Sequence, residues 1–135
     1  MIDHSEMTKG QTFDTIDIVQ FGHKNIVVKS IINKPTGNLS IVAIDTGLLM
    51  ERKPLPFDTY IQVLEGLAKI TIGGQSHTLK QGQSIIIPAR IKGILKAVIR
   101  LKVFMAIIKT GNELLSPEVH LHTVCITENK KASHF

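Results

Sequence analysis

Apolar residues in this chain occur in short runs rich in Ile and Val, and turn-forming residues separate one run from the next. Such runs are typical of β-strands, because branched side chains pack well on a pleated sheet. No segment combines the apolar stripe of an amphipathic helix with capping residues at its ends. The pattern therefore predicts an all-β protein, with strands at 16–21, 25–33, 39–46, 58–65, 67–72, 76–80, 83–88, 91–98 and 100–108.

Turn and strand signals within these runs favour a sheet. Gly73 and Gly74 lie between two predicted strands, and this dipeptide tolerates the positive φ angles of a tight hairpin turn. Apolar and basic residues alternate along 99–103, as in a strand with one face in water. Pro88 closes the run before it, because proline cannot continue the ladder of a central strand. Short strands at regular spacing indicate a sandwich or a barrel.

Both ends of the chain differ from this pattern. Residues 1–14 are polar and mixed, which predicts a flexible N-terminal arm, and the barrel itself is expected within 15–110. Residues 111–135 form a C-terminal extension in which 119–126 alternates like one more strand. We expect this strand at a sheet edge or a dimer interface, because a second copy would cover an exposed edge.

Composition and charge narrow the class of protein. The 135 residues are 43% apolar, which suits one domain with a single core. Cys125 is the only cysteine, the N-terminus lacks a secretory signal and no apolar run is long enough to span a membrane, so we expect a cytoplasmic protein without membrane association. The net charge is +5, but the basic residues are dispersed, and five Phe and one Tyr offer little surface for stacking on bases. We therefore expect no nucleic-acid partner.

Glycines and a proline at regular spacings mark two motifs. The first begins at Gly47 and ends at Gly66, which closes the stretch YIQVLEG. The second runs from Gly82 through five residues to Pro88, and fifteen residues separate the two motifs. Arg90 stands where the second motif usually has a turn glycine. On these motifs the chain resembles the cupin family.

The resemblance covers roughly residues 40–109 and implies a double-stranded β-helix, a jelly-roll barrel that usually forms a homodimer. Cupins with a metal hold it with three His and one Glu, and these positions map onto Lys53, Leu55, Thr59 and Gly93. A protonated lysine repels a cation, and leucine and glycine side chains offer no lone pair. We therefore expect the cupin scaffold without its metal, and no other cofactor.

Such a barrel would enclose a pocket that could bind a ligand. Side chains at alternate strand positions share a face, so an inward Lys53 would place Thr59 in the barrel too, and Gly93 would leave additional room at the mouth. A mostly apolar pocket with a few polar groups suits a small organic ligand, and an inward lysine would favour an anionic one with a carboxylate or phosphate. The candidate pocket residues are Lys53, Leu55, Asp58, Thr59, Ile61, Val63, Arg90 and Gly93.

Simpler roles stand beside these. Lys53 would point to water if it lies on the rim of the barrel, as most lysines do. Asp58 would cap a turn through its carboxylate, and Arg90 would belong to a solvated loop. His120 and His122 would share one face of a strand, but two donors are too few for a stable metal site. A solvent-facing or dimer-facing pair is therefore favoured over a metal site.

These observations leave two functions open. The favoured one is a metal-free cupin-fold protein that binds a small molecule in the barrel. The alternative is a cupin-type enzyme, such as a dioxygenase, isomerase or decarboxylase. That enzyme would use an atypical metal site or acid–base chemistry at Lys53 and Asp58. A sensor domain is less favoured, because no helix-turn-helix segment accompanies the barrel.

Overall fold

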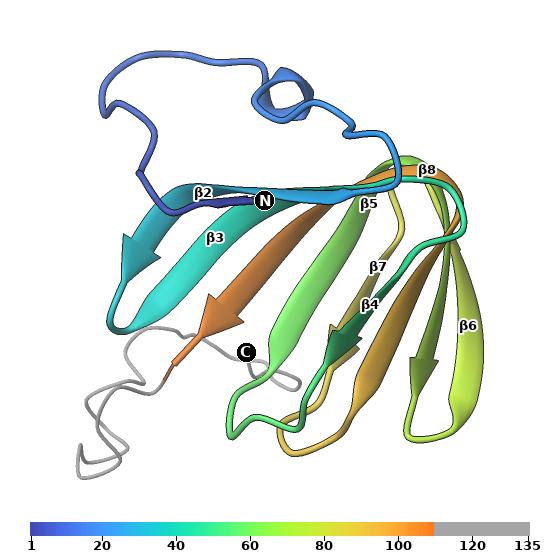
Figure 1. Cartoon of the computed structure of the whole chain (residues 1–135). Helices are drawn as coiled ribbons and strands as arrows, with labels where there is room; N and C mark the ends of the chain where they lie inside the picture. Colours follow the sequence, from blue (N-terminus) through green and yellow to red (C-terminus); the bar gives the residue numbers. More distant parts are fainter. Residues whose placement is uncertain (110–135) are drawn as a thin grey trace, which may run out of the picture.

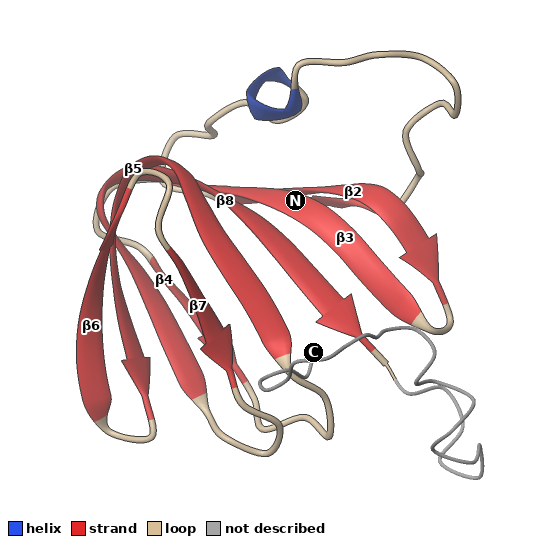
Figure 2. Ribbon diagram, turned by 180° about the vertical axis from the view of Figure 1, so that it is seen from behind, coloured by secondary structure: helices blue, strands red, loops and turns tan. Residues whose placement is uncertain are grey.

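Strands account for most of residues 1–109, the part of the chain that the structure, a computed structural model, describes (Figure 2). A single 3-10 turn, η1 (Thr15–Asp17), precedes the barrel strands, and within the described part no helix is long and apolar enough to cross a membrane. The strands are β1 (Ile2–Asp3), β2 (Ile26–Lys34), β3 (Gly37–Ile44), β4 (Leu49–Arg52), β5 (Thr59–Ile72), β6 (Gln75–Lys80), β7 (Ser84–Ile87) and β8 (Gly93–Ile108).

The strands form two facing layers that share the long strands β5 and β8 (Figure 1). In one layer, β1, β2 and β3 are followed by the second half of β8, the first half of β5 and then β7. In the other, β4 pairs with the first half of β8, which pairs with the second half of β5 and then β6. This two-layered arrangement confirms the predicted all-β jelly-roll barrel.

The two long strands pass from one layer to the other at Gly66. The register between β5 and β8 shifts three times between Val63 and Ala68. Gly66 has a φ of +97°, and a Cβ atom at this position would lie 2.0 Å from the carbonyl oxygen of Arg100 on β8. Only glycine allows this conformation together with so close an approach of two backbones. The sequence predicted a break in each strand here, but both strands continue through the bend.

Other predicted elements vary in outcome. The hairpin at Gly73 and Gly74 is confirmed, since both residues have positive φ and join β5 to β6. The strand predicted at 16–21 is wrong, because this segment holds η1 and then irregular chain. The strand β4 was not predicted. It is only four residues long, and its sequence LMER lacks the β-branched residues that marked the other strands.

The main core lies between the two layers. Most of its buried members come from β5 and β8, where alternate positions such as Ile61 and Val63 face inward and are no more than 1% exposed. The buried members of this core are Val42, Ile44, Ile61, Val63, Ala68, Ile70, Leu79, Ile87, Leu95, Ala97, Leu101 and Val103. Branched aliphatic residues dominate the core, as expected where two pleated surfaces interlock.

The N-terminal segment covers the outer face of the first layer (Figure 1). Val19 is 3% exposed and packs in a second cluster with Ile41 and Ala43 of β3. The segment 1–14 was predicted as a flexible arm. Its first seven residues lie along β2: β1 pairs with β2 in parallel, and the Glu6 carboxylate accepts a hydrogen bond from the Asn33 amide at 2.8 Å. The apolar residues at 16–21 therefore cover the sheet and do not join it.

Lys102 is buried because the N-terminal segment lies over this face of the sheet. The alternation along 99–103 predicted a basic face in water, but Lys102 is only 6% exposed. Its ammonium donates a hydrogen bond to the Ile16 carbonyl at 2.7 Å and lies 5.1 Å from the centre of the Phe21 ring. The lysine is tolerated there because a carbonyl and an aromatic face replace its water.

Acid is expected to weaken the attachment of the segment before β2. The Asp45 carboxylate accepts hydrogen bonds from the Lys24 amide, the Arg100 side chain and the Thr46 amide, which lower its pKa from 3.8 to about 2. Because the pKa is lower in the folded state, this stabilisation is complete above the unfolded value and is lost as the pH falls through about 2. We expect the free energy of unfolding to decline below about pH 4.

Urea denaturation at a series of pH values checks this expectation. The substitution Asp45→Asn should lower stability at neutral pH and make the acid decline shallower, because it removes one of the groups that bind protons on unfolding. Asp17→Asn is the matched control, since Asp17 lies exposed on η1. Parallel acid profiles for wild type and Asp45→Asn would contradict the role given to Asp45.

Candidate functional site

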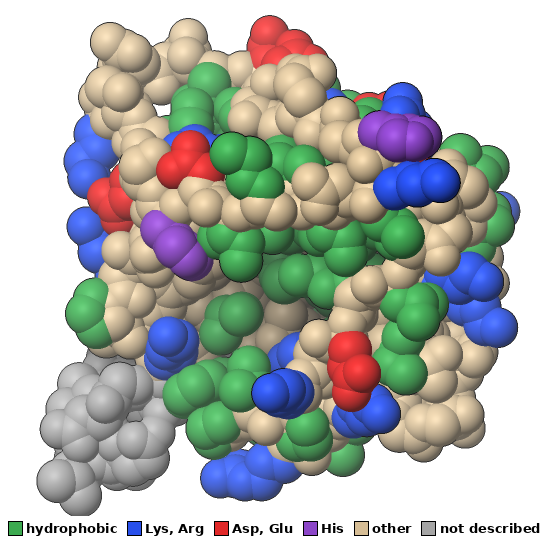
Figure 3. Space-filling model, viewed as in Figure 1, with side chains coloured by type: hydrophobic (Ala, Val, Ile, Leu, Met, Phe, Trp, Pro, Cys, Tyr) green, Lys and Arg blue, Asp and Glu red, His purple; other side chains and the backbone are tan. Residues whose placement is uncertain are grey.

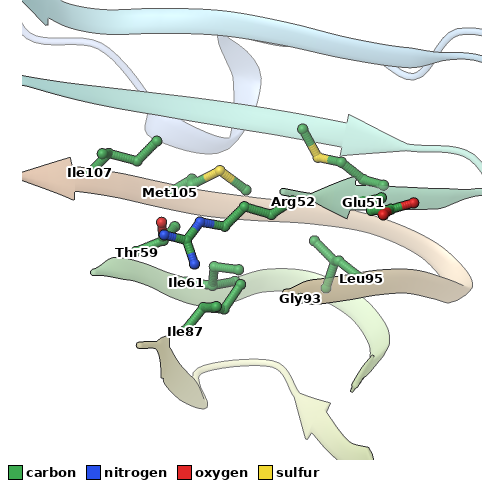
Figure 4. Close-up of a pocket in the computed structure, with 10 residues that line it drawn as sticks. Glu51, Arg52, Thr59, Ile61, Ile87, Gly93, Leu95, Met105 and Ile107 are labelled. Carbon is green, nitrogen blue, oxygen red and sulfur yellow. The ribbon is translucent and has the colours of Figure 1, made fainter. Parts of the chain in front are cut away.

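A pocket of about 170 Å³ opens between the two layers. Figure 3 shows apolar side chains around the hollow on this face of the molecule. Strands β4, β5, β7 and β8 contribute its walls. The lining residues are Met50, Glu51, Arg52, Thr59, Ile61, Ile87, Gly93, Leu95, Met105 and Ile107, and all of them are drawn in Figure 4.

The structure brings some of the candidate residues to this pocket and not others. Thr59, Ile61 and Gly93 line it. Val63 is fully buried in the core beyond it, and Lys53 is exposed. The other candidates do not line it: Leu55 and Asp58 lie in the loop between β4 and β5, and Arg90 lies in the loop between β7 and β8.

Arg52, which the sequence did not single out, enters the pocket in place of Lys53. Along β4 the exposed fraction alternates, so that Met50 and Arg52 face inward, and Arg52 pairs with Gly93. Pro54 and Pro56 follow β4 and end its alternation before Thr59. Counting back from Thr59 could not show which of positions 52 and 53 faces inward.

The Arg52 guanidinium is anchored by backbone carbonyls. Its Nη1 donates to the carbonyls of Pro88 and Ile91, both at 3.4 Å, and its Nη2 donates to that of Phe57. Burial lowers the pKa of Arg52, and the charge of Asp58 raises it in part. The group remains a cation at neutral pH. Its Nε is buried and has no hydrogen-bond partner within residues 1–109.

Thr59 presents a second unsatisfied polar atom to the same pocket. The residue is 0% exposed, and it sits on β5 between Ile87 of β7 and Ile107 of β8. Its Oγ1 has no partner among the residues that the structure describes. Arg52 and Thr59 both line the pocket, and Figure 4 shows the Arg52 side chain extending toward Thr59.

Gly93 does not leave the additional room that its lack of a side chain suggested. A Cβ atom at this position would lie 2.7 Å from the Ile87 Cδ1 and 3.3 Å from two other atoms of that side chain. Ile87 is 1% exposed and fills the space in front of Gly93. An apolar side chain therefore occupies the place where the resemblance puts a histidine ligand.

Asp58 and Arg90 hold the loops beside the pocket. The Asp58 carboxylate accepts a hydrogen bond from the Ala89 amide at 2.8 Å, which ties the loop before β5 to the loop after β7. Arg90 has a φ of +67° and donates its amide to the Leu55 carbonyl. It keeps the left-handed turn conformation that a glycine adopts more readily. The turn of the second motif is thus retained without its glycine.

The residues of this site do not fit the metal that cupins commonly hold. A divalent ion requires several converging N, O or S donors, whereas the pocket presents a guanidinium, a single hydroxyl and aliphatic side chains. Within residues 1–109, no group of three or more His, Cys, Asp or Glu could hold a metal ion. His120, His122 and the extension 111–135 lie outside the described residues.

Comparison with known proteins identifies the fold. No protein-family model matches the sequence, and no curated protein matches it. A conserved protein of unknown function from Streptococcus pyogenes has a TM-score of 0.72 and 21% identity, covering 78% of this chain and 93% of that chain. A cupin 2 conserved barrel domain protein from Leptotrichia buccalis has a TM-score of 0.74 and 18% identity, and the match covers 95% of this chain and 59% of that chain. The salicylate 1,2-dioxygenase from Pseudaminobacter salicylatoxidans has a TM-score of 0.57 and 19% identity, and the match covers 62% of this chain and 26% of that chain.

These likenesses and the two-layered barrel show that this chain has the cupin fold. The resemblance drawn from Gly66, Gly82 and Pro88 is thereby confirmed at the level of the fold. Function has to be argued from the pocket itself, because one fold serves many functions.

Proposed function

We propose that this cupin-fold protein binds a small organic molecule in the pocket between its layers, without a metal. The observation that carries the proposal is the pairing of apolar walls with two buried, unsatisfied polar atoms, on Arg52 and Thr59. Buried polar groups in proteins nearly always have a partner, so an unsatisfied pair in one pocket suggests a ligand that supplies it. A mostly apolar cavity with few polar groups is the usual form of a small-molecule site.

Binding is favoured over catalysis by the residues near the pocket. Acid–base chemistry at Lys53 and Asp58 would require both to meet the ligand, but neither lines the pocket, and Asp58 is hydrogen-bonded to the Ala89 amide. The likeness to a dioxygenase extends to the fold alone and brings no metal donors to this site.

The proposal is tested on the purified protein in two steps. Elemental analysis before and after dialysis against a chelator should find metal far below one ion per chain, because the pocket lacks a donor set. Benzene-sized organic probes, titrated into isotope-labelled protein, should then shift the methyl resonances of Ile61 and Met105, which line the pocket. Near-stoichiometric metal that survives dialysis would contradict the metal-free assignment.

A pocket-filling variant locates the binding. Met105→Phe places a ring in the cavity and should abolish the probe-induced shifts. Ile86→Phe is the matched control, because Ile86 is 51% exposed on β7 next to the buried Ile87. Probe binding that is equal in the two variants would show that the probes bind elsewhere, and the proposed function would fail.

A further inference from the structure

The two unsatisfied atoms have complementary chemistry. The Nε of Arg52 is a hydrogen-bond donor only, and the hydroxyl of Thr59 can donate as well as accept. Both atoms belong to residues that line the same pocket, and both are shielded from water. A ligand atom that accepts from both would remove the penalty of leaving them unpaired.

The positive charge of Arg52 further restricts which hydrogen-bond acceptor of a ligand the pocket would favour. Arg52 is a cation whose Nη1 and Nη2 atoms already donate three hydrogen bonds to backbone carbonyls. No carboxylate of residues 1–109 lies within 4.0 Å of it to form an ion pair. The negative charge of Asp58 acts on Arg52 from beyond ion-pair distance, so the positive charge at the pocket is only partly compensated, which favours an anionic acceptor.

Glu51 also lines the pocket, but it does not compete for this role. Its carboxylate forms an ion pair with the Lys92 ammonium at 3.2 Å, and its side chain is 56% exposed. Figure 4 shows it turned away from the Arg52 guanidinium. An anion beside Arg52 would thus meet little repulsion from Glu51, because water and Lys92 screen that charge.

The other residues that line the pocket are apolar and favour a ligand with a hydrocarbon part. Ile61, Ile87, Leu95, Met105 and Ile107 surround the space beside the two polar atoms. The volume of about 170 Å³ is comparable to an engineered apolar cavity of about 150 Å³ that holds benzene. Inorganic phosphate or sulfate would leave these walls uncovered and would lack donors for most of its oxygens.

We infer that the pocket takes a small apolar carboxylate, whose carboxylate accepts hydrogen bonds from the Arg52 Nε and the Thr59 hydroxyl and whose hydrocarbon part fills the aliphatic end. This inference rests on the proposed function, and it assigns recognition to Arg52, a residue that the ligand positions of the cupin motif do not include. No chemical step is part of it.

Benzoate and nitrobenzene are suitable probes, because they have the same shape and differ in charge. We expect the wild-type protein to bind benzoate at least about 10-fold more tightly in a methyl-NMR titration. Arg52→Met should weaken benzoate binding roughly 10- to 100-fold and leave nitrobenzene nearly unchanged, and Thr59→Val should weaken benzoate roughly 3- to 10-fold. Thr59→Ser should restore most of the loss, since it returns the hydroxyl.

Lys53→Met is the matched control. It removes the same charge one residue along the chain, but from an exposed side chain, so benzoate affinity should stay within about twofold. The comparison of the two probes on wild-type protein needs no variant, so equal binding of benzoate and nitrobenzene would overturn the inference even if Arg52→Met fails to fold. Arg52→Gln, which keeps a polar group, is the second variant.

The outcomes separate the inference from the proposed function. Equal binding of both probes in the pocket, unaffected by Arg52→Met, would overturn the carboxylate inference and leave the small-molecule site intact. An equal loss of benzoate affinity in Lys53→Met and Arg52→Met would overturn it too, because the effect would then be one of net charge. Absence of pocket shifts with either probe and with toluene would overturn both.

Discussion

Replacing Gly66 with alanine is expected to destabilise the protein by roughly 3–5 kcal/mol, a loss large enough to unfold many domains of this size. Two effects add at this position. A left-handed φ of +97° is costly for any residue with a Cβ atom, and the new methyl group would overlap the Arg100 carbonyl oxygen at 2.0 Å. The backbone of β8 would have to move away, which breaks the bend that joins the two layers. Urea denaturation followed by far-UV circular dichroism measures the loss.

Gly74 supplies the matched control for this substitution. It also has a positive φ, +87°, but no atom lies within 4 Å of a Cβ placed there. Gly74→Ala should therefore cost about 1–2 kcal/mol, the strain of the left-handed conformation alone. If Gly66→Ala costs no more than Gly74→Ala, the close approach of β5 and β8 does not contribute to stability.

Truncating Leu101 to alanine is expected to cost roughly 2–5 kcal/mol, whereas the same truncation of Ile99 should cost less than about 1 kcal/mol. Leu101 is 0% exposed and packs in the core between the layers, so its removal leaves a cavity. Ile99 lies on the same strand two residues earlier and is 57% exposed. Denaturation with urea compares the two variants directly.

Comparing Leu101→Ala with Ile99→Ala tests whether the long strands bend in this region. In a straight strand, positions 99 and 101 share a face, and their truncation should have similar effects. In the structure Ile99 pairs with Leu67, at the point where the register between β5 and β8 shifts, so it leaves the core face. Equal losses for Leu101→Ala and Ile99→Ala would mean that β8 runs straight through this region.

Local patterns predicted much of the scaffold. Branched apolar runs indicated the strands, because packing on a pleated surface depends on residue type. Gly73 and Gly74 indicated a hairpin, because their backbone reaches positive φ without strain. The absence of metal donors at positions 59 and 93 could also be read directly, since it depends on the chemistry of the side chains alone.

Other features depend on contacts between residues far apart in the sequence. The segment 16–21 has the composition of a strand, yet it covers the outer face of β3, because that face would otherwise expose Ile41 and Ala43. Lys102 follows an alternating pattern, yet it is buried because this segment lies over it. Local propensity is a weak preference, and burial of apolar area outweighs it.

The pocket shows the same division. From the sequence by itself, the resemblance to cupins predicted the barrel, and the residue types at the cupin ligand positions predicted a largely apolar pocket without the usual His and Glu ligands. The tertiary structure alone decided that Arg52 and not Lys53 enters the cavity, that Ile87 fills the space at Gly93, and that the Thr59 hydroxyl is left without a partner. The direction of each side chain depends on the register between β4, β5 and β8, and long-range packing sets that register.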